Sequence, residues 1–172
     1  MRAVLSLFIC CLCLLLTNCQ KEKYQLIDPE LKDYVDRFFA EAKLRDAEVS
    51  NNNLEVVFED LSNEGLCGRG FFSFGQKNIR RVEISKDLFC WDIRTDFGRE
   101  GLVFHELGHA VLKEIHRNRR LANGLPANMM CGGDVCDVFD YYDHFTLGKR
   151  AYYLDELFNA ATPDPDWGRI KT

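Results

Sequence analysis

The sequence has no surplus of positive charge, since 22 Lys and Arg residues are outnumbered by 27 Asp and Glu residues, for a net charge of −5. A protein that binds nucleic acid needs a basic surface to neutralise phosphates, so this balance excludes nucleic acid as the expected partner. Internal repeats and low-complexity tracts are absent from the sequence as well. With 172 residues, of which 47% are hydrophobic, the chain is expected to form one domain.

Three common ligand-binding patterns are also missing. The glycines near residue 68 are not followed by G-K-[ST], so a phosphate-binding loop is not indicated. The acidic residues between 134 and 143 lack the D-x-D-x-D-G spacing of a calcium-binding EF-hand loop. Beyond residue 19 the cysteines lack the C-x₂-C spacing of a four-cysteine zinc site. Histidine is also scarce, since the sequence contains only 4.

Two of these four histidines belong to an H-E-x-x-H motif at residues 105–109. On a helix, His105 and His109 project from one face because they are four positions apart. They can bind one Zn²⁺, and Glu106 can act as general base towards a water that the metal activates. A core helix with two histidines and a chance glutamate is the competing interpretation, which the scarcity of histidine disfavours.

A catalytic zinc ion usually has three protein ligands, and His116 is the next histidine along the chain. On an uninterrupted helix it would lie about 10 Å beyond His109, at about 1.5 Å per residue, which is too far to share an ion. His116 can be a ligand only if the helix stops soon after Leu112 and the chain folds back. Glu156, His144 or another acidic residue are the alternatives for the third ligand.

The first residues resemble a bacterial lipoprotein signal. Residues 1–2 are a short positive segment, and residues 3–16 form an apolar stretch too short to span a bilayer comfortably. Cys19 then follows in a context that resembles a lipobox, in which the cysteine after the cleavage point carries the lipid anchor. We expect a signal peptide at residues 1–18, a tether at residues 19–27 and an exported, membrane-anchored protein on the periplasmic or cell-surface face. An ordinary signal peptide with a free Cys19 is the alternative.

An exported protein is expected to use its remaining cysteines for disulfides. Four of them are left beyond the signal and Cys19, which is an even number in an oxidising compartment: Cys67, Cys90, Cys131 and Cys136. The sequence does not fix the pairing, although Cys131 with Cys136 would close a small loop and leave Cys67 with Cys90.

Hydrophobic periodicity predicts a single α+β domain over residues 28–172. The expected helices run from residue 28 to about 45, from Thr95 or Asp96 through the H-E-x-x-H motif, and from 151 to 161. The expected strands include residues 54–58, 71–74 and 79–84. We expect a short, mixed or mostly antiparallel sheet packed against these N-terminal, motif-bearing and C-terminal helices.

The motif and its surroundings resemble the metzincin metalloproteases, whose pattern is H-E-x-x-H-x-x-G-x-x-H followed by a methionine-containing turn. Residues 124–130 are similar to that turn, and Met130 matches the structural methionine beneath the metal. The chain departs from the pattern because Leu112 replaces the glycine and Ile115 the third histidine, so that His116 comes one residue late. Most of the mature chain resembles a group of small bacterial lipoproteins described as zinc-dependent metalloproteinases.

This resemblance implies a metzincin-like fold and a zinc-dependent endopeptidase that acts on a peptide or protein substrate. Zn²⁺ would be bound by His105, His109 and His116, with Glu106 as general base. One alternative is a zinc amidase or cell-wall peptide hydrolase, which would use the same metal chemistry. Another is a non-catalytic lipoprotein that keeps the fold to bind a partner.

Overall fold

The computed structural model describes residues 24–75, 79–132 and 149–170. They form a mixed four-stranded sheet and three α-helices. The strands lie in the order β1-β2-β4-β3: β1 (Gln25–Ile27), β2 (Leu54–Glu59), β4 (Ile79–Ser85) and β3 (Gly68–Phe74). The α-helices are α2 (Lys32–Leu44), α3 (Asp96–Leu107) and α4 (Lys149–Phe158).

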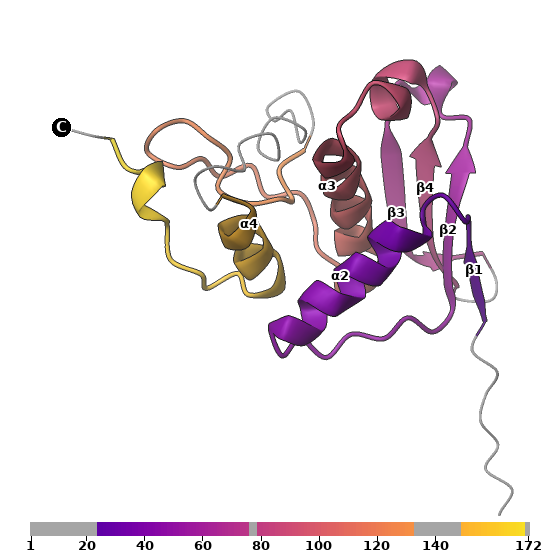
Figure 1. The fold of residues 1–172 in the computed structure, drawn as a ribbon, viewed down its shortest axis with the longest axis horizontal. Helices are drawn as coiled ribbons and strands as arrows, with labels where there is room; N and C mark the ends of the chain where they lie inside the picture. Colours follow the sequence, from indigo (N-terminus) through magenta and orange to yellow (C-terminus); the bar gives the residue numbers. More distant parts are fainter. Residues whose placement is uncertain (1–23, 76–78, 133–148, 171–172) are drawn as a thin grey trace, which may run out of the picture.

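Helices α2 and α3 lie together beside the sheet, and α4 lies on the side of α3 away from the sheet (Figure 1). Alternation along the strands separates a core face from a polar face. Val56 and Val82 are fully buried in the core, with Phe38 of α2 and Phe104 of α3. The motif-bearing helix therefore lies in the middle of the described fold, between the sheet and α4.

The α+β class and the mixed sheet are confirmed, but the expectation of a mostly antiparallel sheet is wrong. β1 pairs with β2 and β2 with β4 in parallel, and only β3 pairs antiparallel, with β4. The connections explain this arrangement. Helix α2 is the crossover between the parallel strands β1 and β2, and β3 is inserted along the chain before β4 as an outer strand.

The predicted tether at residues 19–27 overlaps the fold. Residues Gln25–Ile27 are strand β1, which pairs with β2 from Leu54 to Val56. Three residues are too few to produce a recognisable alternation, so the sequence did not reveal this edge strand. Cys19 and the predicted signal segment lie outside the described residues.

The helix boundaries also differ by a few residues from those predicted. Helix α2 begins at Lys32 because residues 28–31 form a turn, in which the Leu31 amide donates to the Asp28 carbonyl at 3.0 Å. Helix α4 covers Lys149–Phe158 instead of residues 151–161. Helix α3 begins where it was expected, at Asp96, and Thr95 caps it, because its hydroxyl oxygen accepts from the Gly98 amide at 3.1 Å.

A disulfide joins Cys67, just before β3, to Cys90 in the helical turn η3 (Leu88–Asp92). This confirms one of the pairings considered from the sequence. Cys131 is also disulfide-bonded, and Cys136, the partner considered for it, lies outside the described residues. Among the helices of the described ranges, none has both the length and the apolar character needed to cross a membrane.

Candidate metal centre

The side chains of His105, His109 and His116 converge on one point. The three Nε2 atoms lie 3.2 Å (His105 to His116), 3.2 Å (His105 to His109) and 3.1 Å (His109 to His116) apart. Nitrogens bound to zinc at about 2 Å in a tetrahedral arrangement would lie about 3.3 Å from one another. The three atoms therefore have the spacing of one face of a tetrahedron, and together they can hold a metal ion.

The helix ends where His116 requires it to end. Helix α3 stops at Leu107, the wider turn η4 (Gly108–Leu112) follows, and Lys113 adopts a left-handed conformation with φ 63°. The Glu114 amide then donates to the Gly108 carbonyl at 3.1 Å, which closes the turn. Lys113 thus makes the reversal that the metzincin pattern assigns to a glycine at position 112.

Hydrogen bonds on the far side of two rings orient them. His105 Nδ1 donates to the Met129 carbonyl at 2.8 Å, and His109 Nδ1 donates to the Glu114 carbonyl at 2.6 Å. A carbonyl oxygen only accepts, so in each ring Nδ1 carries the proton and Nε2 presents a lone pair. Such outer hydrogen bonds are typical of histidines that bind metals. Lone pairs that face one another repel unless a cation lies between them, so the donor set fits a metal ion.

Burial sets the protonation of the two buried groups of the motif. It lowers the pKa of His105 to about 4, and the neighbouring His109 and His116 contribute to the decrease. His105 is therefore neutral near pH 7, which is the form that binds metals. Burial also raises the pKa of Glu106 to about 8, and a cation nearby would favour its carboxylate form instead.

The predicted methionine turn lies directly behind the histidines. Met130 is fully buried, and a Cβ placed on Gly108 would lie 2.5 Å from the Met130 sulfur. The Met130 carbonyl accepts from the Arg117 amide at 2.8 Å. The segment that follows His116 is therefore hydrogen-bonded to the methionine turn, which packs against Gly108 between the other two histidines in the sequence.

The alternative ligand Glu156 does not reach the site. Its carboxylate, which is 3% exposed, accepts from both terminal nitrogens of Arg117 at 2.6 and 3.2 Å. Glu156 thus supports the chain next to His116 and is not a ligand in this arrangement. His144, the remaining alternative among the histidines, lies outside the described residues.

Strand β3 forms one wall of the candidate site. A Cβ on Gly68 would lie 2.8 Å from the Glu106 side chain, and a Cβ on Gly70 would lie 2.2 Å from the Glu106 carbonyl oxygen. The two glycines therefore let β3 lie directly against α3. They line a cleft of about 260 Å³ together with Glu106, His109 and His116.

Sequence reasoning interpreted these two glycines as a turn and a flexible entry to the strand expected at residues 71–74, which is wrong, because both lie within β3. Gly68 and Gly70 are two residues apart in a strand, so they face the same side of the sheet. Glycine inside a strand often marks a close approach of another backbone. That spacing was the available signal, although it did not say which element would approach.

Comparisons with known proteins found no match to this chain among protein-family models, curated proteins or solved structures. The fold and the site by themselves define a small α+β protein with a candidate three-histidine metal centre on a cleft. Its activity has to be inferred from the chemistry of that cleft.

Gly70→Ala should lower the free energy of unfolding by about 1–3 kcal/mol or more, because the added methyl meets backbone that cannot swing aside. Gly98→Ala is the matched control, since its Cβ would meet nothing closer than 3.5 Å and alanine is the better helix former. Chemical denaturation of both variants measures the difference. Equal stabilities would show that β3 does not lie against α3 as described.

Lys113→Gly should leave the free energy of unfolding unchanged or raise it by up to about 1 kcal/mol, because glycine adopts positive φ without a steric cost. Lys43→Gly, the same exchange in the last turn of α2, should lower it by up to about 1 kcal/mol. Urea denaturation followed by circular dichroism gives both values. A loss at position 113 as large as that at position 43 would contradict the left-handed turn.

Proposed function

We propose that this protein is a zinc-dependent, metzincin-like endopeptidase. The observation that carries the proposal is the convergence of three imidazole Nε2 atoms on a cleft that also contains Glu106. Three histidines are a ligand set found in catalytic zinc sites, where a fourth position stays open. The exposure of His116 supports such an opening on the solvent side of the cluster.

Zinc bound there would lower the pKa of a water molecule and polarise a substrate carbonyl, which is the chemistry that amide hydrolysis needs. The part of Glu106 is to take a proton from the attacking water and deliver it to the leaving amine. Its side chain is buried, lines the same cleft as His109 and His116, and lies against Gly68. This packing holds the Glu106 side chain at the cleft, which supports its proposed part as general base.

Strand β3 supports a peptide as the substrate in preference to a small amide. It is the last strand of the described sheet, so only one of its edges pairs with another strand, β4. Gly68, Arg69 and Gly70 of this strand line the cleft beside the histidines. An extended peptide can bind such a strand through main-chain hydrogen bonds, which would place its backbone next to Glu106.

Export as a lipid-anchored protein is part of the same proposal. The disulfide between Cys67 and Cys90 supports it, because disulfides persist mainly in oxidising compartments. The lipobox-like context of Cys19 is the sequence feature that supports attachment to a membrane. Strand β1 begins only six residues after Cys19, so the domain would stay close to the membrane surface.

Purified protein should bind one Zn²⁺ per chain, and His116→Ala should weaken binding by more than about 100-fold. Loss of outer hydrogen-bond partners alone already costs about 10–100-fold, and a ligand contributes more. Elemental analysis and chelator competition measure the stoichiometry and the affinity. His144→Ala is the matched control and should retain zinc. A wild-type protein that binds no zinc would refute the proposal, and loss of zinc in His144→Ala alone would exclude the ligand set.

Glu106→Gln should retain zinc and lose at least about 100-fold in the rate of cleavage of a labelled unfolded protein, because the amide cannot accept the proton. Glu48→Gln changes an exposed carboxylate elsewhere on the surface and should leave the rate unchanged. Full activity in Glu106→Gln would remove the residue from its role. A wild-type enzyme that hydrolyses small amides or cell-wall peptides, but no unfolded protein, would instead favour the amidase alternative.

A further inference from the structure

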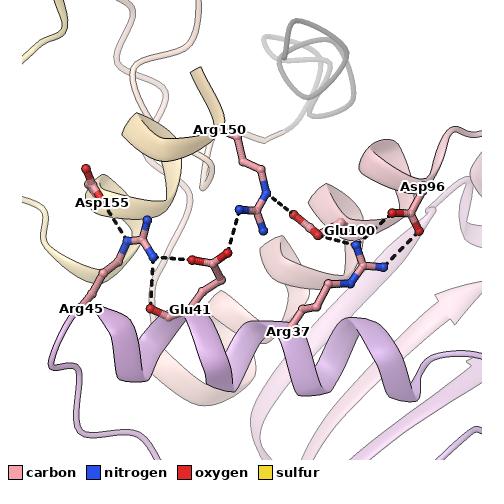
Figure 2. Close-up of polar contacts among 7 residues, drawn as sticks. All are labelled: Arg37, Glu41, Arg45, Asp96, Glu100, Arg150 and Asp155. Atoms are coloured by element: carbon pink, nitrogen blue, oxygen red, sulfur yellow. Dashed lines mark hydrogen bonds and ion pairs between the residues drawn. The ribbon is translucent and has the colours of Figure 1, made fainter. Parts of the chain in front are cut away.

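Seven charged side chains, six on three helices and one, Arg45, directly after α2, form one alternating chain of ion pairs, shown in Figure 2. We call this group the clasp: Asp155, Arg45, Glu41, Arg150, Glu100, Arg37 and Asp96. Positive and negative groups alternate along it without interruption. The clasp connects α4 to α2 and α3, and so it joins the two sides of the fold between which α3 lies.

Arg150 is the central link. Its Nε donates to Glu100 of α3 at 2.7 Å, and its Nη1 donates to Glu41 of α2 at 2.7 Å. Glu100 is 1% exposed, and Arg37 donates to its second oxygen at 2.7 Å. Two arginines from different helices therefore neutralise one buried carboxylate, and removal of either leaves that charge only partly compensated.

A second link lies further along α4, at Asp155. Arg45 donates to Glu41 at 2.5 Å and to Asp155 at 2.8 Å. Helix α4 is thus attached by charged hydrogen bonds at residues 150 and 155, and two points fix both its position and its direction. Apolar burial is non-directional, whereas charged hydrogen bonds impose a particular geometry.

The residues of α4 between and beyond these points bind the segments that build the metal centre. The hydroxyls of Tyr152 and Tyr153 donate to the carbonyls of Ala127 and Pro126 at 2.7 and 2.8 Å, within the methionine turn of residues 124–130. Glu156 accepts from Arg117, the neighbour of His116. Helix α4 therefore lies between the clasp on one side and the third histidine with its supporting turn on the other.

The two halves of the metal centre have different attachments. His105 and His109 belong to α3 and its continuation, which the clasp contacts at Glu100. His116 and the Met129 carbonyl belong to the segments that α4 supports. A shift of α4 relative to α3 would therefore move the third ligand relative to the first two.

We propose that the clasp positions the metal centre, with Arg150 as a positioning residue that sets His116 at ligand distance from His105 and His109. This inference rests on the proposed metal site but adds a function for residues that touch neither the histidines nor the cleft. Metal affinity is sensitive to small displacements, because ligand distances must match within about 0.2 Å. A shift of α4 by a few tenths of an ångström is sufficient to weaken the site.

The test is the affinity of the purified full-length protein for Zn²⁺ and Co²⁺ in the Arg150→Met variant. Methionine keeps a long apolar stem but removes both charged hydrogen bonds. We expect about a tenfold loss of affinity, with the same stoichiometry and an altered Co²⁺ absorption spectrum, as for the loss of other supporting contacts of metal ligands. Circular dichroism at the temperature of the titration confirms that the variant is folded. Lys32→Met removes an exposed ion pair within α2 and should change neither affinity nor spectrum.

A double-mutant cycle separates positioning from general destabilisation. If the clasp acts through His116, Arg150→Met should have no further effect on metal affinity in the His116→Ala background. An equal loss in both backgrounds, or no loss in either, would overturn the proposal. A wild-type protein that binds no metal would refute the proposed function itself, which is a different outcome from normal binding in Arg150→Met.

Asp155→Asn provides a milder variant should Arg150→Met not fold. Asp155 is half-exposed, and its loss leaves Arg45 paired with Glu41, so no buried charge loses its partner. We expect a two- to threefold loss of affinity in the folded protein, again absent in the His116→Ala background. Unchanged affinity in this variant would contradict the proposal.

Discussion

The candidate site depends on the convergence of three imidazole Nε2 atoms about 3 Å from one another. His105 and His109 donate through Nδ1 to carbonyls, so their Nε2 lone pairs face one another, and this arrangement is unfavourable without a cation or a proton between them. It is maintained by what surrounds it: the Met129 and Glu114 carbonyls orient two of the rings, and Met130 packs behind them. A metal ion bound by the three nitrogens would remove this repulsion, so the donor set is better understood as a candidate binding site than as a core feature.

The same requirement explains several local features that look unrelated along the chain. The helix has to end early, so Lys113 adopts a left-handed conformation. The sheet has to approach the helix closely, so Gly68 and Gly70 have no side chains where β3 meets Glu106. The turn at Lys113 brings His116 to the other two histidines, and the two glycines let β3 lie against Glu106.

Buried charge provides the second level of organisation. Glu100 and Glu156 are both almost fully buried, and each is neutralised by arginine from another part of the chain. A buried ion pair adds little to stability compared with apolar packing, but it imposes a geometry. Helix α4 takes part in both groups of ion pairs, through Arg150 towards Glu100 of α3 and through Glu156 towards Arg117, the neighbour of His116, so α4 transmits position from the core to the candidate metal centre.

The sequence by itself determined the local elements and the motif. Hydrophobic periodicity predicted α2, β2 and β4, the start of α3 was expected at Thr95 or Asp96, and the spacing of four residues placed His105 and His109 on one face of a helix. It did not reveal β1, which is too short to show alternation, nor the parallel order of the strands, which depends on long-range pairing. Only the tertiary structure shows that His116 joins His105 and His109, because this requires a turn at Lys113. Lysine rarely adopts positive φ, so the residue type at position 113 did not indicate that turn. Only the tertiary structure shows that Glu156 pairs with Arg117, because an ion pair between distant segments produces no periodic pattern in the sequence.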